Sequence, residues 1–225
     1  PLDERDRHRR PPTRPRRRRL LLGLAVDDDG GAVLLAARAG AEVAHVDASR
    51  KAIAQAFENR DEAGLQDAPV RFITEDAGRF VEREIRRGRQ YDGILLDPPK
   101  YGRGPKGERW RIETDLVPLL DSCRRLLSDR PLFVLLTIYA IRASSQAAHY
   151  ALAETMREAG GEVTSGELVS VERQPAPRVI SQANFARWQP AGGLIAGRFD
   201  EVNAILAGSA ASPPLRARGG AEWGS

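Results

Sequence analysis

Asp97, Pro98 and Pro99 have the residue types and order best suited to chemistry in this sequence. They follow the apolar run 91–96, which has the length of a β-strand. Proline has no N–H and disfavours helix in the residue before it, so the strand must end at Asp97. Ligands of open α/β sheets bind at the carboxyl ends of strands. A carboxylate and bare carbonyls there can accept hydrogen bonds from an amine or amide. Tyr101 can stack on a flat ring. Alternatively, Asp97 only caps the next element.

Two more acidic residues follow apolar runs in the same way. Asp47 follows 42–46, and its two carboxylate oxygens match the two hydroxyls of a ribose. Ser49 then has the position of a helix N-cap, and Asp47 could equally be a helix-entry residue. Asp76 follows 70–74, where it could accept a hydrogen bond from an adenine amine or cap the following helix.

The stretch after the two prolines is rich in glycine and basic residues, with aromatic rings between them. Positive side chains and flat rings suit a nucleic-acid strand, because phosphates attract the charges and bases stack on the rings. The candidate nucleic-acid-binding residues are Lys100, Tyr101, Arg103, Lys106 and Arg109. The alternative is an exposed, mobile loop.

The surrounding elements alternate between strand-like and helix-like patterns. Gly40, Gly64 and Gly88 each come at the end of a helical pattern, where glycine commonly terminates a helix. The expected strands are 20–26, 42–46, 70–74, 91–96, 131–138, 162–172 and 179–188. The expected helices include 32–39, 49–63, 113–127 and 144–159. This order predicts an α/β, Rossmann-like, seven-stranded and mostly parallel sheet. It has helices on both faces and an antiparallel C-terminal edge strand.

Charge divides the chain of 225 residues into three parts. Residues 1–19 hold nine arginines against three acids, whereas the rest holds 26 basic and 28 acidic residues. We therefore expect a disordered basic tail at 1–19, a folded domain at 20–188, and a tail at 189–225 with one short helix, 199–206. No apolar run is long enough to span a bilayer, and no metal-ligand cluster is present. Cys123, the single cysteine, has helical spacing to leucines, which predicts a buried thiol and fits a cytoplasmic protein.

From Gly30 to Trp188 the chain resembles the class I S-adenosylmethionine-dependent methyltransferases. More narrowly, it resembles the bacterial rRNA methyltransferases that include the 23S rRNA cytosine-C5 enzymes. The segments that carry the resemblance are 39–49, 58–59, 76–77, 97–104 and 185–188. The resemblance implies S-adenosylmethionine as cofactor and ribosomal RNA as partner. Its implied cofactor-binding residues are Gly30, Asp47, Ala48, Ser49, Asp76, Ala77 and Asp97. Its implied catalytic residues are Asp97, Pro98, Pro99 and Tyr101.

The sequence departs from this family in two places. The cytosine-C5 enzymes have a nucleophilic Cys after the fifth strand, and 136–140 contains none. Asp97 and a proline carbonyl instead suit direct transfer of the methyl group to an exocyclic or ring nitrogen. Most of the rate enhancement then comes from positioning the two reactants in line. The family's aromatic-Thr-Gly turn after the first strand is matched only at Gly30, behind the three acids 27–29. A catalytically impaired fragment is therefore one alternative, and a methyltransferase for proteins or small molecules is another.

Overall fold

The computed structural model describes residues 20–25, 30–139, 141, 143–172 and 178–192. The expected basic tail, the acids 27–29 and the expected short helix 199–206 lie outside these residues. No helix within the described ranges is long and apolar enough to cross a membrane.

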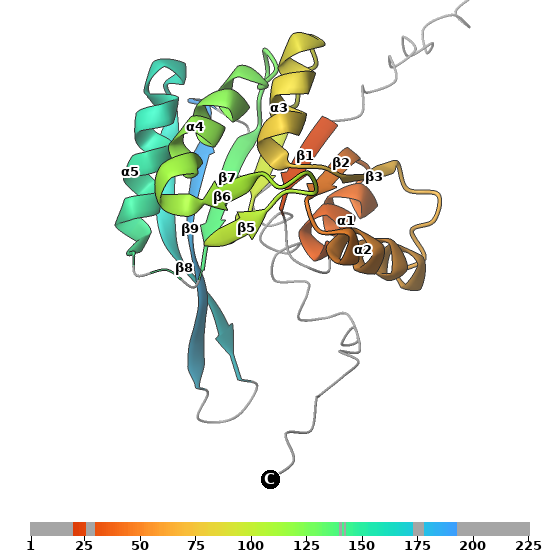
Figure 1. The fold of residues 1–225 in the computed structure, drawn as a ribbon. Helices are drawn as coiled ribbons and strands as arrows, with labels where there is room; N and C mark the ends of the chain where they lie inside the picture. Colours follow the sequence, from red (N-terminus) through yellow and green to blue (C-terminus); the bar gives the residue numbers. More distant parts are fainter. Residues whose placement is uncertain (1–19, 26–29, 140, 142, 173–177, 193–225) are drawn as a thin grey trace, which may run out of the picture.

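Seven strands form one sheet in the order β3-β2-β1-β4-β7-β9-β8 (Figure 1). The strands are β1 (Leu20–Leu24), β2 (Glu42–Asp47), β3 (Val70–Thr74), β4 (Gly93–Leu96), β7 (Phe133–Ile138), β8 (Glu162–Val171) and β9 (Val179–Gln189). The five strands from β3 to β7 pair in parallel, and β9 runs antiparallel to both of its neighbours. The predicted fold class is confirmed, with the final hairpin at one edge of the sheet.

Helices cover both faces of this sheet (Figure 1). They are α1 (Gly31–Arg38), α2 (Arg50–Glu62), α3 (Ala77–Arg86), α4 (Ile112–Arg125) and α5 (Ser145–Met156), followed by the short 3-10 helix η2 (Arg157–Ala159). Alternate strand residues supply two cores, as the two-residue period of a strand requires. Leu22 packs in the core with α3 to α5, and Leu21 packs in the core with α1. Cys123 is fully buried in the first core, as predicted.

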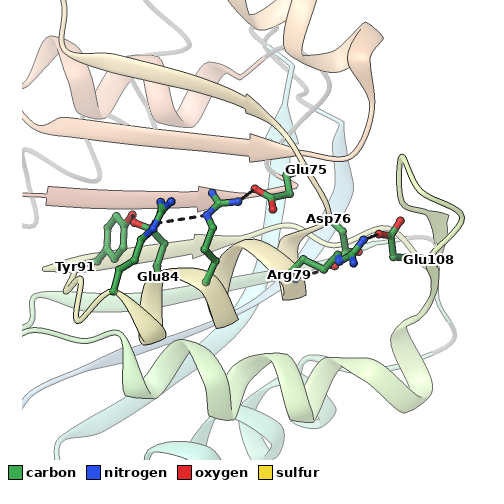
Figure 2. A network of polar contacts seen from close by, with 8 residues as sticks. Glu75, Asp76, Arg79, Glu84, Tyr91 and Glu108 are labelled. Carbon is green, nitrogen blue, oxygen red and sulfur yellow. Dashed lines mark hydrogen bonds and ion pairs between the residues drawn. The ribbon is translucent and has the colours of Figure 1, made fainter.

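The charged helix α3 is fixed to the sheet by a buried polar contact (Figure 2). Glu84 is 2% exposed, and its carboxylate accepts a hydrogen bond of 2.9 Å from the Tyr91 hydroxyl. Arg87 donates to the other carboxylate oxygen at 3.2 Å, and Arg83 contacts Glu75 at the start of the helix. A buried carboxylate needs such partners, because its charge is otherwise costly to remove from water. This network fixes the turn that precedes α3.

The segment after the two prolines is more regular than expected. Residues 100–111 contain the antiparallel hairpin β5 (Tyr101–Arg103) and β6 (Arg109–Arg111), which sequence reasoning missed. The following helix begins at Ile112, one residue earlier than expected. Asp115 stabilises its N-terminus by accepting a hydrogen bond of 2.7 Å from the Arg111 backbone N–H.

His45 is a buried histidine in the middle of β2. Its side chain is fully buried, and its ring lies 5.8 Å from the Phe72 ring, edge to face. Neither ring nitrogen has a hydrogen-bond partner among the described residues. Burial lowers the pKa of His45 from 6.5 to about 4, because the charged imidazolium would lose its hydration there.

This burial predicts an acid-dependent loss of stability. Between pH 7 and pH 5 the unfolded chain gains a proton on His45, whereas the folded protein does not. The free energy of unfolding should therefore fall by about 2 kcal/mol through this residue alone. The contribution of His45 is measured by urea unfolding of wild type and of His45→Phe at both pH values. Any packing cost of the phenylalanine is the same at pH 7 and pH 5, so it cancels when the change with pH is compared between the two proteins. An equal loss in both proteins would contradict the assignment.

Candidate active site

Three acidic residues lie where neighbouring parallel strands end. Asp47 ends β2, Asp76 follows β3 and Asp97 follows β4. The sheet order places β1 between β2 and β4, so the three carboxyl ends share one edge. Backbone hydrogen bonds connect the turns: Glu75 N–H donates to the Asp47 carbonyl at 3.0 Å, and Asp97 N–H donates to the Leu24 carbonyl at 3.2 Å. Backbone hydrogen bonds therefore connect the Asp47 turn to the turn that holds Asp76, and they connect the Asp97 turn to the end of β1, which lies between β2 and β4.

Asp47 and Ser49 form the turn that starts α2. The Ser49 backbone N–H donates to Asp47 Oδ1 at 2.6 Å, and Ser49 Oγ accepts from the Ala52 N–H at 3.2 Å. Ser49 is the predicted N-cap, and Ala48 lies between the two residues. Asp47 is half-buried. The helix-entry role of Asp47 is therefore present, and it fixes the direction of the carboxylate that we predicted to bind ribose.

Asp76 caps α3, and Ala77 is the first residue of that helix. Asp76 Oδ1 accepts a hydrogen bond of 2.9 Å from the Arg79 backbone N–H. None of the described residues forms a hydrogen bond with its second oxygen, Oδ2. The capping alternative is thus observed, and one carboxylate oxygen is still available for a ligand amine.

The turn after β4 is held by several donors. Thr137 Oγ1 on β7 contacts Asp97 Oδ1, and the Trp110 indole N–H donates to the Pro99 carbonyl at 2.6 Å. Among the described residues, neither Asp97 Oδ2 nor the carbonyl of the buried Pro98 has a hydrogen-bond partner. Two acceptors with capacity to spare therefore come from successive residues of this turn.

Sequence reasoning did not identify Thr137 or Trp110 as parts of this turn. Thr137 is the single polar residue of the strand Phe133–Ile138. A lone hydroxyl near the end of an apolar strand was the available signal. Trp110 is an aromatic residue of the same basic stretch, and its indole N–H fixes the Pro99 carbonyl.

The β5–β6 hairpin presents a basic face with one aromatic ring. Tyr101 pairs with Arg111 and Arg103 pairs with Arg109, so these four side chains share one face. Tyr101 is 57% exposed, and the Lys100 ammonium lies 5.1 Å from the centre of its ring. No described acidic residue forms an ion pair with Arg103 or Arg109. Like charges directly opposite each other destabilise a hairpin, and a bound anion would relieve that repulsion.

The tip of the hairpin contacts the start of α3 (Figure 2). Arg79 and Glu108 form an ion pair of 2.5 Å, and Glu108 also accepts from the Lys106 backbone N–H at 2.8 Å. The pKa of the Glu108 carboxyl is lowered, chiefly by its own backbone N–H and then by the hydrogen bonds from the Lys106 N–H and from Arg79. A cavity of about 130 Å³ lies beside them, lined by Thr74, Glu75, Asp76, Arg79, Pro105, Lys106 and Glu108. The structure therefore brings Lys106, predicted for RNA, next to Asp76, predicted for the cofactor.

Gly30 has a clear packing role. Its φ is 70°, and an added Cβ would lie 2.7 Å from Ala56 Cβ, so glycine allows α1 and α2 to approach each other. Ala25, at the end of β1, has a φ of 47°, which costs a non-glycine residue about 1–2 kcal/mol. The first turn thus begins in a left-handed conformation, although 27–29 lie outside the described residues.

Other features lie away from these turns or supply no ligands. A larger groove of about 520 Å³ over α4 and α5 contains none of the predicted site residues. Within the described ranges, no cluster of three or more His, Cys, Asp or Glu side chains could hold a metal ion.

Comparison with known proteins connects this arrangement to methyltransferases. No family model matches the chain. A solved structure of an S-adenosylmethionine-dependent methyltransferase from Agrobacterium tumefaciens is 51% identical, with a TM-score of 0.74, over 78% of this chain and 57% of that one. A protein of Methanocaldococcus jannaschii, provisionally named a ribosomal RNA large subunit methyltransferase, is 36% identical over 78 residues, 35% of this chain and 20% of that protein. Ribosomal RNA large subunit methyltransferase I of Aeromonas salmonicida is 35% identical over 60 residues, 27% of this chain and 15% of that protein.

The seven-stranded, mostly parallel sheet with helices on both faces is the fold of the class I S-adenosylmethionine-dependent methyltransferases. Within that class, the matches relate the chain to the ribosomal RNA large subunit methyltransferases over the part that they cover. The chain spans a fifth or less of the curated relatives and 57% of the A. tumefaciens structure.

The contact at the hairpin tip predicts a local change in protection. Glu108→Ala removes the partner of Arg79 and the acceptor of the Lys106 N–H, so the tip should open more often. Tryptic cleavage after Lys106 should become roughly fivefold faster, as measured by mass spectrometry of timed digests. Glu113→Ala, at an exposed acid in the first turn of α4, is the matched control. Equal cleavage rates in the two variants would mean that the contact does not hold the tip.

Proposed function

We propose that this chain is an S-adenosylmethionine-dependent methyltransferase that modifies a base nitrogen in RNA, with ribosomal RNA as the substrate class. The observation that carries the proposal is the line of three acidic turns at the carboxyl ends of β2, β3 and β4. The 51% identity to the A. tumefaciens methyltransferase supports the cofactor. The two relatives named for large-subunit ribosomal RNA support the substrate class.

The donor set of these turns fits this cofactor. Asp47 would bind the ribose hydroxyls, with Ala48 and Ser49 shaping its turn. Asp76, whose Oδ2 has no partner among the described residues, would accept from the adenine amine beside Ala77. Acidic strand ends also suit a cationic sulfonium better than the anionic pyrophosphate of a dinucleotide. Gly30 contributes indirectly, by letting α1 and α2 approach each other behind the turn.

The turn after β4 supplies the acceptor side of the reaction. Bound S-adenosylmethionine supplies an electrophilic methyl group. Asp97 Oδ2 and the Pro98 carbonyl can each accept one N–H from an exocyclic amine, which aims the nitrogen lone pair at that group. As the N–C bond forms and the methyl–sulfur bond of the donor breaks, the nitrogen would lose a proton, and Asp97 would accept it. Pro99 has its carbonyl occupied by Trp110, so its role is to hold the turn. No cysteine is needed, because the base forms no covalent bond to the protein.

The hairpin face is the proposed RNA contact. Arg103 and Arg109 would bind backbone phosphates, and Tyr101 offers a ring on which a base can stack. Lys100 lies beside that ring, and Lys106 is at the hairpin tip next to the cofactor end of the site. Tyr101 would therefore act in substrate binding.

The cofactor assignment predicts a specific binding defect. Wild type should bind S-adenosylmethionine with micromolar affinity in calorimetric titration, and Asp47→Asn should weaken binding at least tenfold, because a charged acceptor of two hydroxyls is lost. Asp67→Asn, at an exposed acid in the loop before β3, should bind like wild type. A folded wild-type sample that does not bind would overturn the proposed function and favour the impaired fragment.

The substrate assignment predicts transfer of tritium from S-adenosyl-[methyl-³H]methionine to an unmodified 23S rRNA transcript. Arg103→Ala should raise the KM for the transcript and reduce the salt slope of RNA binding by about 1, because one phosphate contact is lost. Arg86→Ala, at an exposed arginine of α3, is the matched control. Transfer to protein or to small molecules, with none to the transcript, would disprove the RNA assignment.

A further inference from the structure

Thr137 is the residue of β7 that lies directly beside Asp97. The parallel register pairs Leu96, the last residue of β4, with Leu136, so Asp97 just after β4 lies level with Thr137 of β7. Thr137 Oγ1 contacts Asp97 Oδ1, and it lies 3.3 Å from the Leu96 carbonyl. The hydroxyl has one proton to donate. Hydrogen bonds to a carboxylate are stronger than those to a neutral carbonyl, so the proton goes to Asp97.

The position of Thr137 makes this contact stiff. Its backbone is paired with Phe185 of β9, and the residue before it, Leu136, is paired with Leu96 of β4. A β-branched side chain has few χ1 rotamers in such a strand, so the hydroxyl is held in place rather than found by rotation. Asp97 stands at the first position after its strand. Its backbone N–H donates to the Leu24 carbonyl, and its carboxylate is contacted by the Thr137 hydroxyl. The hydroxyl therefore decides which way the carboxylate faces.

We infer that Thr137 is a positioning residue for methyl transfer. This inference rests on the proposed function. By holding Oδ1, it turns Oδ2 toward the amine that is to be methylated. Thr137 does not itself contact the reacting atoms. Its removal should reduce the contribution of Asp97 to amine binding and to turnover, while cofactor affinity stays the same.

The first test needs binding alone. Sinefungin carries an amine where S-adenosylmethionine carries its methyl group, whereas S-adenosylhomocysteine has nothing there. Wild type should bind sinefungin more tightly than S-adenosylhomocysteine in calorimetric titrations. Thr137→Val, which keeps the side-chain shape, should reduce that preference by about tenfold, the scale of one hydrogen bond to a charged group. Thr137→Ser should retain the preference.

A buried threonine elsewhere supplies the matched control. Thr155 is 7% exposed on α5, and its hydroxyl donates to the Ala151 carbonyl at 2.9 Å. Thr155→Val removes a hydroxyl of the same kind and should leave the sinefungin preference intact. A preference that is unchanged in Thr137→Val, or equally reduced in Thr155→Val, overturns the positioning role. Failure of wild type to bind either compound contradicts the cofactor assignment itself.

Turnover gives the second measurement. With the unmodified 23S rRNA transcript, Thr137→Val should lower kcat about tenfold or more with little change in the KM for S-adenosylmethionine. Thr137→Ser should restore most of the rate, which a purely structural defect would not show. An unchanged kcat in an otherwise active Thr137→Val enzyme also overturns the inference.

Discussion

The missing N–H groups of Pro98 and Pro99 are the constraint on which the site depends. Because neither residue can donate to a ladder, β4 ends abruptly and the chain turns away from the sheet. The carbonyls of this turn then have to find donors elsewhere. Trp110 supplies one to Pro99, and the Ile112 backbone N–H supplies another to Lys100 at 3.1 Å. The hairpin and the start of α4 are therefore positioned by hydrogen bonds to the same turn that presents Asp97.

A common arrangement recurs at the three acidic turns. One carboxylate oxygen of each aspartate accepts from a nearby donor: the Ser49 N–H, the Arg79 N–H or the Thr137 hydroxyl. Capping and ligand binding are thus compatible roles for these side chains. A carboxylate has two oxygens, and fixing one of them directs the other. An acid that looks structural in the free protein can for this reason be a better ligand than one that rotates freely.

The sequence predicted the parts of the molecule that depend on local pattern. Apolar runs, prolines and glycines placed the seven strands, and the ends of those strands placed the three acids. The hairpin was missed because its strands have three residues each and alternate arginine with tyrosine, tryptophan and glycine, without an apolar face. Thr137 and the cavity beside Glu108 were missed for a different reason. Both depend on which strands and turns become neighbours, and only the folded sheet determines that.

The hairpin gives the two halves of the site a common support. Its base is attached to Pro99 in the turn that presents Asp97, and its tip is attached through Glu108 to Arg79 in the first turn of α3. Its outer face carries Arg103 and Arg109 opposite each other, and their like charges repel each other unless an anion lies between them. RNA bound on that face would stabilise the same hairpin that lines the cavity beside Asp76. In the proposed function, substrate and cofactor would therefore both lie against this hairpin.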